Sequence, residues 1–455
     1  MQNIIRKENF KEQVINVWKL SIPAILTQIA SIVMQYIDSA MVGNLGENAS
    51  ASIGLVSTTT WLFGGIITAV AVGFSVQIAH AFGASKYKEG RSVLRHGLIF
   101  SVLFGLLLMF IGIGVCWELP KWLGASDSIW RDSSLYFLVF SITLPFMQLN
   151  SFTASSLQCS GNMVVPSVLN ALMCLLDVVF NAIFIPKYQV LGAAIGTGLA
   201  TAVVSLIMFY FCCLRNKKLK ITIRDKTKYD KDILKKAFKI GLPIAVEQVA
   251  RSGAMIVSTG IVAPLGNTAI AANSFAVTAE GLCYMPGFGV ASAATTLVGQ
   301  EMGAKNNKKA KSYGNISIML GTLIMTITAI LMFILCPYVF MFLTPVEEVR
   351  SLSTTILRIG LIAEPLYGVS IVASGALRGA EDTFVPSILN LLSIWVVRIT
   401  LSILLVGKFG LVGVWIANTV ELCVRGLLLL FRQKTSKYYF KKKEKVDSNL
   451  INYEI

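Results

Sequence analysis

Long apolar stretches separated by short polar loops run through the chain from one end to the other. About 20 consecutive, mostly apolar residues let a helix cross a bilayer. Twelve stretches are long enough, and they lack the alternation that marks membrane strands. We therefore predict an all-α integral membrane protein with twelve transmembrane helices, at 17–42, 52–80, 92–116, 134–157, 163–186, 190–213, 240–264, 270–300, 314–342, 353–377, 384–406 and 409–431.

The amino-acid composition also indicates an integral membrane protein. The chain has 455 residues, of which 55% are hydrophobic and 14% charged, whereas a soluble domain has about a quarter charged residues. The net charge of +16 could indicate nucleic-acid binding. However, the lysines and arginines lie in loops between apolar runs rather than on one face of a polar domain, which argues against that class.

The basic residues also predict the orientation. With twelve spans, the lysine- and arginine-rich loops at 86–95, 215–239 and 305–311 fall on the same side as both chain ends. The positive-inside rule therefore places both termini in the cytoplasm, in a multi-pass protein of the cell membrane. The polar start of the chain does not read as a signal peptide. We expect the basic tail to be disordered or to lie on anionic lipid.

The sequence repeats itself after 220 residues. WKLSIPAILTQIA at 18–30 matches FKIGLPIAVEQVA at 238–250, and VPSVLN at 165–170 matches VPSILN at 385–390. Because six spans per half is an even number, the halves are parallel repeats, related by a pseudo-twofold axis along the membrane normal. Rocking of such halves around a central cavity is a transporter's architecture. The predicted parts are an N-terminal lobe (1–214), a basic cytoplasmic linker (215–239), a C-terminal lobe (240–432) and a basic cytoplasmic tail (433–455).

Two aspartates stand inside apolar spans of the first half. An ionised carboxylate at mid-membrane costs several kcal/mol, so such residues usually mark ion paths; the alternative is a structural aspartate that is capped or paired. At 1.5 Å per residue, Asp38 and Asp177 both rise roughly 22 Å above the cytoplasmic side, and Thr197 reaches the same level. Two close carboxylates in a poor dielectric disfavour double ionisation. The pair would therefore hold and release a proton, as a proton antiporter requires.

The second half carries other charges within its spans. Glu247 and Arg251 have the spacing of a favourable helical pair. The charges can neutralise one another inside the bundle, for example Arg398 with Glu364 or Arg251 with Glu280. Alternatively they line a substrate cavity, where an arginine suits zwitterions or anions better than a purely cationic substrate. The predicted cavity residues are Gln28, Gln248, Glu247, Arg251, Glu280, Tyr284, Glu364, Tyr367, Trp395 and Arg398.

The remaining reactive side chains give weaker signals. The eight cysteines lie mostly in apolar stretches, and we interpret them as packing residues. Only two histidines are present and no cysteine pair has metal spacing, so no metal or cofactor is predicted. We interpret His80 as interfacial and Arg378 as a loop anchor.

The two-half pattern resembles the MATE family of multidrug and toxic compound extruders. The resemblance rests on a proline in the first helix of each half and on DSAMVGNLG at 38–46, MPGFGVASAATTLVGQEMGAKN at 285–306 and GALRGAEDTFVPSILN at 375–390. It covers the whole membrane portion. It implies secondary active efflux of organic cations or amphiphilic compounds, driven by protons or sodium ions.

Within that family the chain is more similar to the DinF-like branch. This resemblance implies a coupling site made of Asp38, Asp177 and Asn150. Two positions differ, because Met34 and Met173 stand where the branch often has tyrosine and asparagine. We include Tyr36, the nearest tyrosine, and Thr197 in the predicted coupling site. The NorM-like branch binds its cation with carboxylates in helices seven and ten. Arg251 and Tyr367 occupy those places, so proton coupling is favoured over sodium.

Two other functions compete with efflux. A flippase of the same superfold, moving a lipid-linked oligosaccharide or peptidoglycan precursor, would need a cationic cavity for pyrophosphate. Arg251 and Arg398 favour it, whereas the two aspartates do not. An integral membrane enzyme is not expected, because no histidine–metal motif, nucleophile elbow or phosphate loop is found. One pseudosymmetric chain can form a complete pathway, so we expect a monomer.

Overall fold

Helices make up almost all of the structure, a computed structural model that describes residues 9–221 and 229–440. No strand occurs in these two ranges. The elements are α1 (Phe10–Gly43), α2 (Glu47–Gly83), α3 (Tyr87–Val115), α4 (Leu119–Trp122), α5 (Asp127–Cys159), α6 (Val164–Phe209), the π-helical η1 (Tyr210–Arg215), α7 (Lys231–Val262), the 3-10 turn η2 (Ala263–Leu265), α8 (Asn267–Gly303), α9 (Asn307–Leu343), α10 (Glu347–Leu361), α11 (Glu364–Gly379), α12 (Phe384–Leu392), the π-helical η3 (Ser393–Ile399), α13 (Thr400–Thr435) and the 3-10 turn η4 (Lys437–Phe440).

The helices confirm the twelve-span prediction. Across the described ranges, nine continuous stretches are long and apolar enough to cross a membrane, and α10 with α11 forms a tenth that bends by 54°. Two of the nine contain a sharp break, one at Gln189 in α6 and one at Gly410 in α13. Each break divides its stretch into two spans, close to the predicted boundaries. The ten stretches therefore provide twelve crossings.

The sequence repeat is also visible in the backbone. Residues with positive φ recur in pairs 220 positions apart, and the two breaks, with φ of 51° and 55°, lie 221 apart. Left-handed backbone is uncommon for residues other than glycine, so matching positions reflect matching turns. The pairs are Gly46 with Gly266, Ser85 with Lys305, Gly161 with Glu381, and Gln189 with Gly410.

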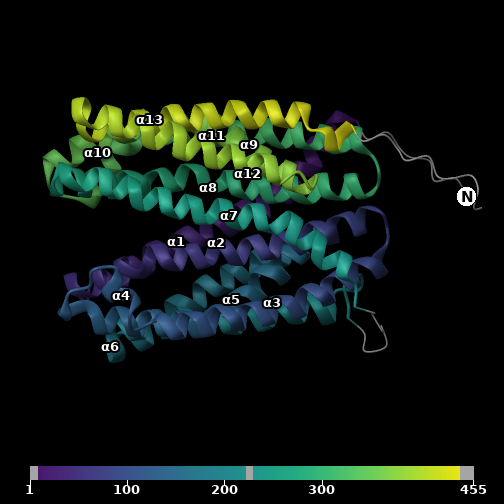
Figure 1. Ribbon diagram of the computed structural model, residues 1–455, viewed down its shortest axis with the longest axis horizontal. Coiled ribbons are helices and arrows are strands. Elements are labelled where there is room, and N and C mark those ends of the chain that lie inside the picture. Colours follow the sequence, from purple (N-terminus) through teal and green to yellow (C-terminus); the bar gives the residue numbers. More distant parts are fainter. Residues whose placement is uncertain (1–8, 222–228, 441–455) are drawn as a thin grey trace, which may run out of the picture.

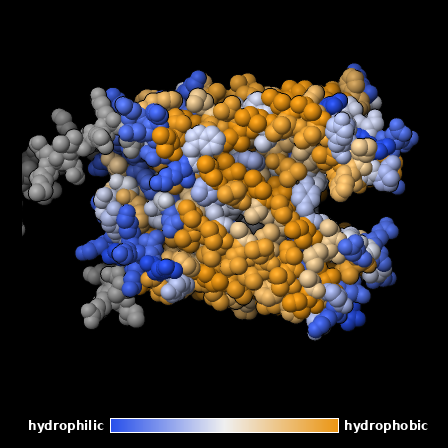
Figure 2. All heavy atoms as spheres, turned by 180° about the vertical axis from the view of Figure 1, so that it is seen from behind, coloured by the Kyte–Doolittle hydropathy of each residue, from blue (hydrophilic) through white to orange (hydrophobic). Residues whose placement is uncertain are grey.

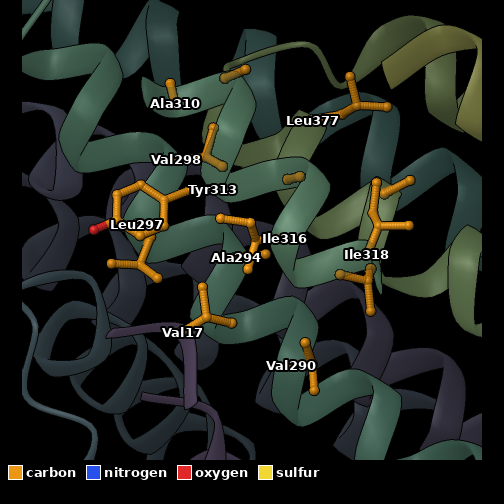
Figure 3. Close-up of a cluster of buried hydrophobic side chains, with 14 of the residues drawn as sticks. Val17, Val290, Ala294, Leu297, Val298, Ala310, Tyr313, Ile316, Ile318 and Leu377 are labelled. Carbon is orange, nitrogen blue, oxygen red and sulfur yellow. The ribbon is translucent and has the colours of Figure 1, made fainter. Parts of the chain in front are cut away.

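The two halves form two lobes, and the first helix of each lobe also packs against the other lobe. In Figure 1, α1–α6 form one layer and α7–α13 the other. Val17 of α1 packs into the core of the C-terminal lobe beside Val290 and Leu297 (Figure 3). Ala237 of α7, its repeat equivalent, packs into the core of the N-terminal lobe. Each lobe therefore contributes to the other's interior.

The lobes meet tightly at the end of the bundle that holds Asn9 and Phe440, which we call the basic end. A Cβ on Gly83 would overlap the Gln300 carbonyl, and one on Gly303 would overlap the His80 carbonyl. The two backbones thus touch directly across the pseudo-twofold axis. At the opposite end, Figure 2 shows a gap between the lobes, and the face in view is apolar between the two polar ends.

Helical structure extends into the predicted linker and into the predicted tail. Helix α7 begins at Lys231, inside the predicted linker, because Asp230 caps it by accepting a hydrogen bond from the Asp232 amide. In the predicted tail, the Ser436 hydroxyl donates to Asp382 (2.7 Å) and the Tyr439 hydroxyl to Gln433 (3.1 Å). These bonds hold η4 against the C-terminal lobe. The expectation for the rest of the tail (441–455) and for linker residues 222–228 falls outside the described residues.

Candidate functional site

Asp38 of α1 and Asp177 of α6 lie together, joined by Asn181. The Asn181 side-chain amide donates to Asp38 Oδ1 at 2.9 Å and to Asp177 Oδ2 at 3.3 Å. The two carboxyl groups are therefore close neighbours, held by one and the same side-chain amide. Two carboxyl groups this close in a poor dielectric do not readily ionise together. The arrangement is a carboxyl pair that can share one proton, which we call the acid pair.

The two members of the acid pair differ in how deeply they are buried. Asp177 is fully buried, whereas Asp38 is partly exposed. Asp177 Oδ1 and Asn181 Oδ1 are buried and lack a hydrogen-bond partner in the described part of the chain. A Cβ on Gly196 would overlap Asn181 Oδ1, so this glycine makes room for the bridging amide. Asp38 is therefore the more accessible member of the pair.

The other residues predicted for the coupling site are not joined to the acid pair. Tyr36 donates to the Thr278 carbonyl of the other lobe at 2.9 Å. Two residues correspond to about 200° around a helix, so Tyr36 and Asp38 face opposite ways. The structure therefore does not bring Tyr36 to the acid pair. Within the described ranges, Asn150 and Thr197 form no side-chain hydrogen bond with either aspartate. Asn181 was missed, although its position four residues after Asp177 places both on one helix face.

A second polar site is a small pocket in the C-terminal lobe, with a volume of about 30 Å³. Among the described residues, Glu247 and Arg251 interact electrostatically but do not form the direct ion pair that their spacing predicts. The Glu247 carboxylate instead accepts hydrogen bonds from Ser387 and Asn390 of α12, both at 2.8 Å. The pocket is lined by Glu247, Arg251, Phe288, Ala291, Tyr367, Ser370, Ile371, Ser374, Arg378, Asn390 and Arg425.

The charged side chains around this pocket have different partners from those predicted. Arg425 forms an ion pair with Glu421, with 3.0 Å between the two side chains. Arg398 interacts electrostatically with Glu421 and Glu280 rather than with Glu364. Arg251 interacts with Glu247 and Glu421 rather than with Glu280. Glu364 is fully buried, and neither of its carboxyl oxygens has a partner among the described residues.

The predicted cavity residues therefore separate into groups. Glu247, Arg251 and Tyr367 line the pocket, and the Tyr284 ring lies 5.4 Å from that of Tyr367. Arg378 and Arg425 also line it, so treating Arg378 only as a loop anchor missed its contact with the pocket.

The remaining predicted cavity residues lie outside the pocket lining. Gln248 packs against Gly65 of the other lobe, and the Trp395 indole donates to the Ala250 carbonyl at 3.1 Å. Gln28 is half-buried on α1. Glu280, Glu364 and Arg398 lie in the surrounding charge network.

A third polar cluster closes the basic end. His80 of α2 contacts the Gly379 carbonyl at 2.8 Å and the Glu381 carboxylate at 3.2 Å. Lys236 of α7 reaches the same carboxylate at 2.6 Å. This cluster joins the N-terminal lobe to the loop between α11 and α12. It would have to separate if the lobes opened at this end.

Comparison with proteins of known sequence gives relatives along the whole chain. The probable multidrug resistance protein NorM of Thermotoga maritima is 26% identical, and the alignment covers 94% of each chain. The probable multidrug resistance protein YoeA of Bacillus subtilis is 24% identical, again over 94% of each.

Solved structures agree on the fold. A MOP superfamily transporter from Pyrococcus furiosus superposes with a TM-score of 0.90 at 22% identity, covering 96% of this chain and 98% of that one. A mutant form of the Vibrio cholerae MATE transporter VcmN gives 0.89 at 17% identity, with coverage of 95% and 99%.

The sequence profile of the MatE family matches residues 23–183 and again 243–404, once in each lobe. This double match repeats the 220-residue offset found within the chain. MatE proteins are transporters rather than enzymes. The chain therefore belongs to the MatE family.

Proposed function

We propose that the chain is a secondary active antiporter that exports organic cations or other amphiphilic compounds in exchange for protons. The names of the relatives support multidrug cargo and favour it over a lipid-linked precursor. The parallel repeat supports alternating access between two lobes. The proposal places the chain in the cytoplasmic membrane as a monomer, with both termini in the cytoplasm.

The acid pair is the observation that carries proton coupling. Asp38 and Asp177 are close enough that ionising both in a poor dielectric is unfavourable, so the pair holds one proton. Asp38 is partly exposed and exchanges that proton with solvent, while buried Asp177 shares it. When the proton is lost, both carboxylates are ionised, and the Asn181 amide is the group that donates hydrogen bonds to them. This change in hydrogen bonding couples protonation to the packing of α1 against α6.

Alternating access follows from the contacts between the lobes. With the basic end in the cytoplasm, the gap in Figure 2 opens to the outside. External protons then reach Asp38, near the outer end of α1. Opening toward the cytoplasm requires the lobes to part at Gly83 and Gln300 and to break the contact between His80 and Glu381. Binding of cargo from the cytoplasm would follow that opening.

The experiment is dye extrusion in vesicles carrying an imposed pH gradient. Asp38→Asn and Asp177→Asn should each abolish proton-driven export of an ethidium-like dye while leaving the protein folded. Asp127→Asn is the matched control, because Asp127 is an exposed residue in the first turn of α5. Normal export by both site variants would overturn the assignment of the acid pair.

A second arm of this experiment identifies the driving ion. Export should continue when sodium is removed and stop when the pH gradient is collapsed. A requirement for sodium with no response to the pH gradient would contradict proton coupling. It would leave the efflux function itself intact.

A further inference from the structure

Two of the three arginines in the C-terminal pocket lack an anionic contact within the described ranges. Arg425 is paired with Glu421. Glu247, the carboxylate in the pocket lining, is held by Ser387 and Asn390. Arg251 and Arg378 form no hydrogen bond or ion pair with described residues. Both side chains are half-buried. A guanidinium that has lost part of its water gains from a nearby anion, so the pocket favours an added negative charge.

The charge balance of the pocket leaves room for one anion. Arg378 interacts electrostatically with both Glu247 and Arg251. Glu421 also interacts with Arg251, but it is already paired with Arg425. The one carboxylate that remains, Glu247, can offset at most one of the two guanidinium groups, so one positive charge is left. The other buried carboxylates, Glu280 and Glu364, are not part of the lining.

The dimensions and walls of the pocket restrict what this anion can be. A volume of about 30 Å³ is enough for one small group such as a carboxylate, but not for a whole drug-sized molecule. Phe288 and Ile371 add apolar surface beside the arginines. Guanidinium groups bind carboxylates in a planar, bidentate fashion. The site therefore suits a carboxylate whose apolar body remains outside the pocket.

Comparison of the two repeats shows that the fold does not require these charges. The N-terminal lobe forms the same helices with uncharged side chains at the matching positions. Thr27, Ser31 and Gln158 take the places of Glu247, Arg251 and Arg378. Since charged groups are expensive inside a membrane protein, their presence in one lobe alone points to a role in binding.

We propose that Arg251, Arg378 and Arg425 form a binding site for a small anionic group in the C-terminal lobe, one that selects amphiphiles bearing a carboxylate. This rests on the proposed efflux function and names a class of cargo for it. A free inorganic anion has the same charge and would use the same arginines. The experiment therefore has an arm for each source.

The test measures equilibrium binding of two dyes to the purified full-length protein in lipid nanodiscs. One dye is a zwitterionic rhodamine with a free carboxylate, and the other is its methyl ester. The wild type should bind the carboxylate dye about tenfold more tightly. Arg251→Gln and Arg378→Gln should remove this preference, with a smaller effect on the ester. Arg358→Gln is the matched control, because Arg358 lies on α10 against the Phe333 ring, outside the pocket.

Further arms separate the possible results. Arg251→Lys should retain part of the preference, because it keeps the charge but loses the bidentate geometry. If chloride displaces the carboxylate dye but not the ester, the site also accepts a free anion. If chloride binding depends on Arg251 and Arg378 while the dyes bind alike, the occupant is inorganic and the anion site stands. Equal dye affinities with no effect of chloride would overturn the site.

Binding requires no ion gradient, so this result is independent of export. If the ester is exported but no carboxylate preference appears, the anion site fails and the efflux proposal stands. If neither dye is exported but an arginine-dependent preference is found, the efflux proposal fails and the site stands.

Discussion

The side-chain amide of Asn181 lies 2.9 Å from the carboxylate of Asp38 and ties α6 to α1. The same amide reaches Asp177, so one residue connects both members of the acid pair. Changes in their charge are therefore transmitted to two helices at once. This makes Asn181 a more sensitive position than its neutral side chain suggests.

Replacing Asn181 with alanine should reduce proton-driven dye export about tenfold or more, since hydrogen bonds to charged groups contribute about 1.5–3 kcal/mol. The measurement is the initial export rate in vesicles at a fixed pH gradient. Asn170→Ala provides the control, because Asn170 is on the same helix and makes no contact with the aspartates. Wild-type export by the Asn181 variant would show that the bridge is dispensable.

Gly196→Ala should reproduce much of this loss without touching a polar atom. The added methyl group would overlap Asn181 Oδ1 and push the amide away from the aspartates. Export rates should fall while the protein remains monodisperse in detergent. Gly64→Ala should behave like the wild type, because a Cβ there meets open space. Equal rates for both variants would contradict the account of Asn181.

Gly83→Ala should weaken closure at the basic end, because its methyl group would overlap the Gln300 carbonyl. Cys159 is a natural reporter: it is almost fully buried, and its carbonyl accepts a hydrogen bond from Gln300 at 2.9 Å. Alkylation of Cys159 by an impermeant maleimide, followed by peptide mapping, should accelerate several-fold. Gly43→Ala, at the opposite end, is the control. An unchanged rate would mean that the contact does not hold the lobes together.

Gln189→Gly should stabilise the protein. Gln189 is exposed and has φ 51° and ψ −125°, a conformation that costs residues with a Cβ about 1–3 kcal/mol. Its repeat equivalent, Gly410, adopts nearly the same angles without that cost. Thermal unfolding in detergent should show a higher midpoint for Gln189→Gly and a lower one for Gly410→Gln. Shifts of the opposite sign would exclude backbone strain at the break.

The sequence predicts the spans well because lipid imposes a long apolar run on each helix. Depth is predictable too, since helical rise alone puts Asp38 and Asp177 at one level. Partners on other helices are not predictable in this way. Spacing along one helix pairs Glu247 with Arg251, but Ser387 and Asn390 approach from α12. That approach depends on how α7 and α12 pack, which no single-helix rule describes.

The exchange of Val17 and Ala237 between the lobes has a consequence for biogenesis. When the first six helices have entered the bilayer, α1 still lacks the surface that it will cover, and the N-terminal core still lacks its contribution from α7. Neither half can reach its final packing until the other has been synthesised. The two lobes therefore depend on each other for folding, as the subunits of an obligate dimer do, although they belong to one polypeptide.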